Sequence, residues 1–243
     1  MKALRFLNPL VNPAQSWRLL GKLTLPLTIL ALAALTVGIV WGLFIAPVDY
    51  QQGHSYRIIY VHVPMAFLAQ SIYMFIAANA LGLLIWKVKF CDWAMEAAAP
   101  IGAAVCFFAI ASGAIWGKPT WGTWWVWDAR LTSMLVLLLL YAALISLRTA
   151  LPRAETAAKM CAWLALIGVI NIPIIKFSVD WWFTLHQPAT LKLTGSSTIH
   201  PSMLWPLLWM IASAYLWFAA ALVARLRTVI VARESAKKWV EEL

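Results

Sequence analysis

The sequence has few charged residues. Asp, Glu, Lys and Arg together occupy 12% of its 243 positions, whereas apolar residues occupy 63%. The mean hydropathy is +0.81. A soluble domain needs a more polar surface than this composition can supply, so the chain is predicted to be an integral membrane protein.

Cysteines, linkers and repeats are also scarce. The three cysteines, Cys91, Cys106 and Cys161, are far apart and form no Cys-x-x-Cys or zinc-finger spacing, which argues against thiol exchange and a structural metal site. There is no Gly/Ser-rich linker, low-complexity tract or internal repeat. We therefore expect one polytopic domain, residues 1–243, with the cysteines as small buried residues.

Long uncharged runs predict the transmembrane helices. A hydrocarbon core of ~30 Å requires ~20 mostly apolar residues in a helix. Runs of about that length lie at approximately 23–44, 65–86, 97–116, 131–147, 161–178 and 202–224. The sequence thus predicts an all-α bundle of about six transmembrane helices, preceded by a segment, residues 1–22, that could lie along the membrane surface.

The centres of these runs lack ionisable residues. Carriers of ions or charged solutes place such residues at mid-membrane, and only two amides, Gln70 and Asn171, occur there in this sequence. Amides at this depth are typical of hydrogen bonds between helices. A solute permease is therefore disfavoured.

The basic residues indicate the orientation. Fourteen of the nineteen Lys and Arg residues fall on the side of the two termini, and five fall on the other: Arg57, Lys118, Arg130, Lys176 and Lys192. Because basic loops are retained in the cytoplasm, both termini are predicted to be cytoplasmic. The net charge of +10 is then explained by contact with membrane lipid headgroups rather than with nucleic acid.

All four histidines fall in or beside the outer segments, which are roughly 45–64, 116–130 and 179–201. They are His54, His62, His186 and His200. Imidazole is a common axial ligand of haem iron, so this confinement favours a ligand site on the outer face. For His54 and His200 alone, a solvated polar residue at the membrane interface is the favoured interpretation.

Five of the sixteen tryptophans lie within residues 116–127. An aromatic belt explains scattered indoles at the headgroup level, but this density favours a rigid apolar surface for a flat aromatic ligand. If the segment were helical, four residues would share one face: Trp121, Trp124, Trp125 and Asp128.

Charged residues flank this segment. Asp128 and Arg130 either pair with each other, cap the following helix or serve the ligand. The cations close enough to meet the propionates of a haem on this face are Arg57, Lys118, Arg130 and Lys192.

Three segments resemble a known family. Residues 121–132, Trp-Gly-Thr-Trp-Trp-Val-Trp-Asp-Ala-Arg-Leu-Thr, resemble the WWD motif of haem-handling proteins. Residues 57–64 and 181–188 resemble the two outer-loop histidine motifs of the haem exporter protein C family, which belongs to the bacterial cytochrome c maturation system. The larger haem lyases share the WWD motif but need more spans than this chain supplies.

The resemblance implies specific roles. His62 and His186 would be the axial ligands of haem b (iron protoporphyrin IX). Among the cations named above from their positions, Arg57 and Arg130 are the propionate candidates. The haem platform would consist of Trp121, Trp124, Trp125, Trp127 and Asp128. The chain would be a non-catalytic subunit in the bacterial inner membrane, acting with the ABC-type subunits (haem exporter proteins A and B) and a small single-span partner, haem exporter protein D. It would hand haem to a periplasmic chaperone, haem chaperone protein E.

Two other functions remain open. A b-type cytochrome would transfer electrons through a haem held by histidines inside the bundle, whereas His62 and His186 are predicted at or outside the membrane surface. A haem-translocating permease subunit would have to pass two propionates through spans without a charged interior, which is costly. Handover of haem at the outer face fits the residues better.

The topology can be tested with an impermeant thiol reagent. In a cysteine-free variant in intact spheroplasts, Lys118→Cys is expected to be labelled and Lys159→Cys to be protected, because the first lies on the predicted outer side and the second on the cytoplasmic side. The reverse pattern would contradict both the orientation and the outer location of the site.

Overall fold

The computed structural model describes residues 12–186 and 199–243, and within these ranges it contains helices and no β-strand. Six helical segments are long and apolar enough to cross a bilayer: Pro13–Ile45, His54–Trp86, Lys89–Trp121, Ala129–Ala150, Ala154–Trp181 and Pro201–Arg233. The predicted all-α architecture with six spans is confirmed.

The spans are built from the following elements. The first comprises α2 (Pro13–Ile39) and the π-helical turn η2 (Val40–Ile45). The short 3-10 helix η3 (His54–Ile58) leads into α3 (Ile59–Trp86), and α4 (Lys89–Trp121) and α5 (Ala129–Ala150) follow. The fifth span consists of α6 (Ala154–Gly168) and α7 (Asn171–Trp181), the sixth is α8 (Pro201–Arg233), and a short α9 (Lys238–Glu241) follows it.

Several helices extend beyond the predicted runs. The first begins at Pro13 rather than at residue 23, so residues 13–22 continue the helix of the first span instead of forming a separate segment. The side chain of Asn12 caps this helix by accepting hydrogen bonds from the backbone of Ala14 and Gln15. A hydropathy window finds only the residues in hydrocarbon, whereas a helix continues into the headgroup layer until a cap ends it.

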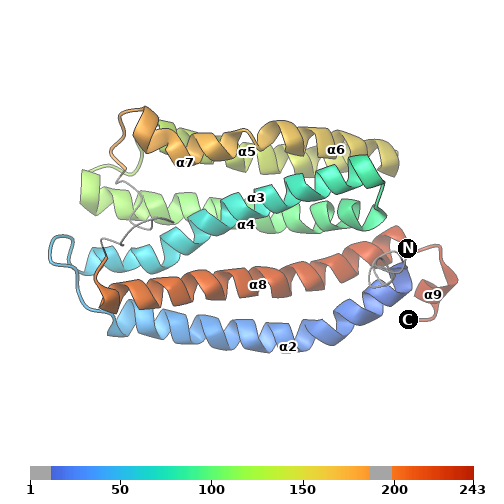
Figure 1. Ribbon diagram of the computed structural model, residues 1–243, viewed down its shortest axis with the longest axis horizontal. Coiled ribbons are helices and arrows are strands. Elements are labelled where there is room, and N and C mark those ends of the chain that lie inside the picture. The colour runs from blue at the N-terminus through green and yellow to red at the C-terminus, as the bar shows by residue number, and fades with distance from the viewer. Residues whose placement is uncertain (1–11, 187–198) are drawn as a thin grey trace.

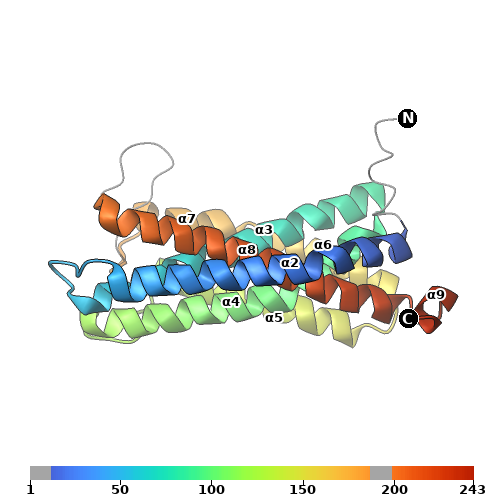
Figure 2. The same cartoon turned by 90° about the horizontal axis from the view of Figure 1, so that it is seen from below.

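The two ends of the bundle are distinct. In Figure 1, α3 and α4 occupy the middle, α2 and α8 lie on one side, and α5, α6 and α7 lie on the other. Figure 2 shows the same elongated arrangement from below. The start of α2 and the end of α8 lie at one end, on the right of Figure 1. This follows from the six spans, because an even number of crossings returns the chain to the side on which it began. The opposite end, where α4 ends and α5 begins, is called the histidine end below.

Small residues allow the central helices to approach closely. The rings of Tyr73 and Tyr141 meet edge to face at a centroid distance of 5.3 Å, and the Tyr141 hydroxyl donates to the Ala69 carbonyl. A Cβ at Gly102 would clash with the Tyr141 ring, and one at Gly168 would clash with the Tyr73 hydroxyl oxygen. Glycines at both positions are therefore required by the packing, as is common between transmembrane helices.

The fifth span is interrupted between Gly168 and Asn171. Pro173 has no backbone N–H, so it cannot form the hydrogen bond that would continue the helix from α6. The side-chain amide of Asn171 donates to the Ser133 carbonyl of α5 at 2.9 Å, which fixes the interruption against a neighbouring span. This contact confirms the prediction that Asn171 forms a hydrogen bond between two helices.

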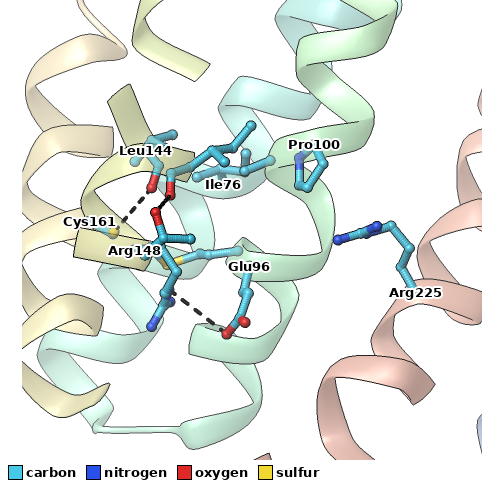
Figure 3. A pocket seen from close by; sticks show the side chains of 11 residues that line it. Ile76, Glu96, Pro100, Leu144, Arg148, Cys161 and Arg225 are labelled. Carbon is cyan, nitrogen blue, oxygen red and sulfur yellow. Dashed lines mark hydrogen bonds and ion pairs between the residues drawn. The ribbon is translucent and has the colours of Figure 1, made fainter. Parts of the chain in front are cut away.

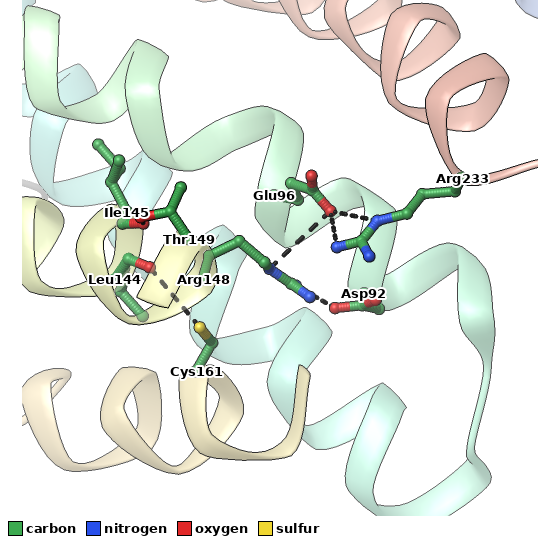
Figure 4. Close-up of polar contacts among 8 residues, drawn as sticks. All are labelled: Asp92, Glu96, Leu144, Ile145, Arg148, Thr149, Cys161 and Arg233. Carbon is green, nitrogen blue, oxygen red and sulfur yellow. Dashed lines mark hydrogen bonds and ion pairs between the residues drawn. The ribbon is translucent and has the colours of Figure 1, made fainter. Parts of the chain in front are cut away.

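Charged residues tie three helices together at the end where α2 begins and α8 ends (Figure 4). Arg148 of α5 forms an ion pair with Asp92 of α4. Arg233 of α8 donates to Glu96 of α4 at 2.6 and 2.9 Å. This end of the bundle is thus joined by ion pairs, and we refer to these four residues as the charged network.

Candidate functional site

His62 lies in the first turn of α3, and its ring is held by α4. Nδ1 is 3.0 Å from the Ala109 carbonyl oxygen and 3.2 Å from the Ser112 hydroxyl oxygen. A carbonyl can only accept, so Nδ1 carries the proton and Nε2 holds the lone pair of a neutral imidazole. A Cβ at Gly113 would approach the His62 ring to 2.8 Å, so this glycine provides the space for it.

His186 follows the end of α7 and is tied to the start of α5. Its backbone N–H donates to the Thr184 hydroxyl at 3.1 Å, and that hydroxyl donates to one carboxylate oxygen of Asp128. The other oxygen of Asp128 accepts from the Leu131 backbone N–H at 2.8 Å and caps α5. The helix cap that was one alternative for Asp128 is therefore present.

Arg130 contacts the same region, where α5 begins and α7 ends. Its guanidinium donates to the Ser178 hydroxyl at 3.2 Å and to the Lys176 carbonyl at 3.2 Å, both in α7. Its Nη1 is 3.3 Å from Nδ1 of His186. One side chain from the first turn of α5 therefore contacts both the last turns of α7 and the imidazole beyond them.

The two imidazoles meet at the histidine end. The ring centroids of His62 and His186 are 6.3 Å apart, with the planes inclined by 36°. Trp116 packs edge to face on His62 at 5.7 Å, and Trp121 lies 6.0 Å from His186. Two metal–imidazole bonds of ~2.0–2.1 Å plus the distance from each nitrogen to its ring centre give a comparable separation.

The tryptophan segment is not a helix beyond Trp121. Gly122 ends α4 in the left-handed conformation, with a φ of 79°, and the chain then runs non-helically to Asp128. The condition under which Trp121, Trp124, Trp125 and Asp128 would share a helical face is therefore not met, because Gly122 ends one helix and Asp128 caps the next. Residues 116–121, predicted in the outer loop, belong to α4.

The indoles of this segment differ in exposure. Trp124 and Trp127 are 56% and 75% exposed. Trp125 is partly buried, and its Nε1–H is enclosed without a hydrogen-bond partner among the described residues. It contacts Trp127 edge to face at 5.5 Å. The segment thus offers two exposed aromatic faces and one unsatisfied donor.

The other cations and histidines named in the sequence analysis have different surroundings from His62, His186 and Arg130. Arg57 donates to the carbonyls of Leu43 and Ala46 and closes the first outer loop, and Lys118 donates to the Gly122 carbonyl. Lys192 lies outside the described residues. His54 is exposed at the start of η3, and His200 caps α8 by accepting from the Ser202 backbone N–H.

Sequence reasoning missed the residues that position His62. Ala109, Ser112, Gly113 and Trp116 contact it from one face of α4, at helical spacings of three and four residues. Small residues followed by an aromatic on one face were visible as a pattern. The sequence did not show that this face meets α3, because a helical spacing does not identify the partner helix.

The role of Asp128 can be tested by thermal unfolding of the purified chain. Asp128→Ala removes both the α5 cap and the acceptor for Thr184, and is expected to cost about 1–2 kcal/mol. Thr184→Val removes the second contact and the acceptor of the His186 N–H but leaves the α5 cap in place, and is expected to cost less. Asp128→Asn, which retains a capping oxygen, should be the mildest Asp128 change. Equal unfolding temperatures for Asp128→Ala and the wild type would contradict this assignment.

Comparison with known proteins places this chain in a family. The profile of the family described as "Heme exporter protein C" matches residues 6–241. "Heme exporter protein C" of Escherichia coli (strain K12) is 46% identical over 237 residues, 98% of this chain and 96% of the relative. The protein of the same name from Haemophilus influenzae is 42% identical over 242 residues, 98% and 97% of the two chains. A "cytochrome c biosynthesis ccmC-like mitochondrial protein" of Marchantia polymorpha is 43% identical over 190 residues, 78% of this chain and 80% of its own length. The chain belongs to the haem exporter protein C family.

Proposed function

We propose that this protein binds haem at the outer face of the bacterial inner membrane and hands it to a periplasmic haem chaperone, protein E, during maturation of c-type cytochromes. The observation that carries the proposal is the meeting of His62 and His186, whose ring centroids are 6.3 Å apart beside the tryptophan segment. The names of the relatives support haem and cytochrome c biosynthesis as its context.

Haem would be cargo held by two axial imidazoles. Within the described residues no group of three or more His, Cys, Asp or Glu side chains gathers as a metal site. Two imidazoles complete the coordination of an iron only if a macrocycle supplies the remaining ligands, and haem does so. The unsatisfied Nε1–H of Trp125 and the exposed rings of Trp124 and Trp127 fit such a cargo, since they offer a donor and aromatic surface.

Binding would require a small rearrangement around Arg130. A guanidinium only donates, so Nδ1 of His186 accepts in the present contact. For Nε2 of a neutral His186 to bind iron, Nδ1 must carry the proton, and Arg130 must turn away. The released guanidinium nitrogen would then be available to a propionate. Arg57 is the weaker propionate candidate because both its terminal nitrogens bind backbone carbonyls.

The surroundings of the site suit handover rather than catalysis. The exposed side chains of Trp124 and Trp127 would let the chaperone approach the haem directly. The chain's own residues would bind, orient and release haem b, and no bond in it need be made or broken. The protein would act as a non-enzymatic subunit beside the ABC-type subunits (haem exporter proteins A and B) and the single-span haem exporter protein D, with both termini in the cytoplasm.

The proposal is tested by the absorption spectrum of the purified chain with haem. The wild type is expected to show a low-spin spectrum, because two neutral imidazoles give a strong axial field. His62→Gly and His186→Gly should each produce a high-spin spectrum or lose haem, and added imidazole should partly restore the low-spin form by filling the vacant position.

His54→Gly is the matched control. His54 is also an outer-face histidine but is exposed in η3, and its loss should leave the spectrum unchanged. A low-spin spectrum in the His62→Gly/His186→Gly variant would refute the ligand assignment, as would equal haem loss in the His54→Gly variant.

The tryptophan platform is tested separately. Trp124→Ala is expected to weaken haem retention several-fold without impairing insertion, because its side chain is 56% exposed and contributes little to the core. Trp163→Ala is the control: its indole is equally exposed, at 56%, but belongs to α6, away from the site. Haem retention that falls equally in both variants, or in neither, would argue for a membrane belt instead.

A further inference from the structure

A cavity of ≈ 140 Å³ lies next to the charged network, at the end of the bundle opposite the histidine pair. Helices α3, α4, α5, α6 and α8 contribute to it (Figure 3). It is lined by Ile76, Met95, Glu96, Ala99, Pro100, Leu144, Ile145, Arg148, Thr149, Cys161 and Arg225. Most of these residues are apolar, and the charged ones are Glu96, Arg148 and Arg225.

The cavity lies at the boundary between hydrocarbon and headgroups. Helix α5 has 22 residues, which at ~1.5 Å per residue is about the ~30 Å thickness of a hydrocarbon core. Its two ends therefore mark the two boundaries, and Arg148 lies two residues before its end at Ala150. The exposed Thr149 and Arg225 open the cavity to the surroundings of the bundle at this level.

The charges around the cavity leave one cation in excess. Asp92 is paired with Arg148, and Glu96 is paired with Arg233 at 2.6 Å and lies 3.8 Å from Nε of Arg148. Arg225 forms no ion pair within the described residues, and Figure 3 shows its side chain reaching from α8 toward α4.

Arg148, which lines the cavity, also has an unsatisfied donor. Nη1 of Arg148 is buried and has no hydrogen-bond partner among the described residues. An enclosed guanidinium N–H without an acceptor is costly, and a charge-assisted bond to an anion would remove that cost. The charge of Arg225, which has no ion-pair partner among the described residues, calls for an acceptor that carries a single negative charge.

We propose that the cavity binds the phosphodiester of an anionic phospholipid, with Arg225 as its ligand and Arg148 in the cavity wall. The volume admits a headgroup phosphate but neither a porphyrin nor a whole lipid. The acyl chains would lie outside, along the apolar faces of α5 and α8. A zwitterionic headgroup would bind more weakly, because its ammonium group would add a second cation beside Arg225. The bound lipid would contact α4, α5 and α8, whose residues line the cavity.

The proposal is tested by native mass spectrometry of the purified full chain titrated with phosphatidylglycerol, phosphatidylethanolamine or inorganic phosphate. Phosphatidylglycerol is expected to bind most tightly and to raise the unfolding temperature. Arg225→Gln should weaken phosphatidylglycerol binding about fivefold, the effect of one cation near an anionic lipid. Arg153→Gln is the matched control, because Arg153 is exposed at the same end of the bundle, at the start of α6, and outside the cavity.

A steric variant separates occupancy from charge. Thr149→Trp leaves the charges unchanged and, at an exposed position on the cavity rim, should block the phosphate while the chain still folds. Equal affinity for the two phospholipids, or equal losses in Arg225→Gln and Arg153→Gln, would overturn the proposal. Binding of inorganic phosphate without binding of phosphatidylglycerol would overturn the choice of a lipid. Unchanged phosphatidylglycerol binding in Thr149→Trp would overturn the location.

Discussion

The close approach of α3 to α4 is the constraint on which the site depends. These helices form the middle of the bundle, and at the histidine end the interface contains an imidazole rather than an apolar side chain. The ring fits because Gly113 has no side chain, and its tautomer is set because the Ala109 carbonyl accepts from Nδ1. A buried polar group is tolerated within a span only when it is hydrogen-bonded in this way, so the same contacts stabilise the interface and orient His62.

The second imidazole is held by a different set of contacts. His186 lies beyond the end of α7, and a chain of short polar contacts through Thr184 and Asp128 ties it to the first turn of α5. Arg130 adds a contact from the same turn. One histidine is therefore fixed by helix packing and the other by a helix cap. The second, which follows a helix end rather than lying within a packed span, is the one more easily moved when a ligand enters or leaves.

The two ends of the bundle use charge in opposite ways. At the end where α2 begins and α8 ends, two carboxylates and two arginines are paired across α4, α5 and α8, which joins the helices where they enter the headgroup layer. At the histidine end, the carboxylate of Asp128 serves a cap and a hydroxyl, and Arg130 contacts carbonyls and an imidazole. The first arrangement is neutralised internally. The second leaves a cation beside the two imidazoles, where an anionic substituent of a cargo could meet it.

Much of the architecture was determined by the sequence alone. Hydropathy is a local property, and the requirement that every backbone group be satisfied in hydrocarbon converts each long apolar run into a helix, so the six spans were predictable. The WWD segment and the two histidine motifs are likewise short, contiguous patterns, and they were sufficient to indicate the family. Helix ends were less predictable, because they depend on single residues such as Asn12 and Gly122 in the headgroup region, where hydropathy carries little information.

Only the tertiary structure decided which faces meet. His62 and His186 are 124 residues apart along the chain, and no local pattern places one imidazole against the other; the packing of α3 on α4 and of α7 on α5 does so. The same packing assigned Arg57 to the carbonyls of Leu43 and Ala46 and Arg130 to the neighbourhood of His186, although both had looked alike as outer-face cations. Residue type determines what a side chain can bind, but the partner that it reaches is set by long-range contacts between helices.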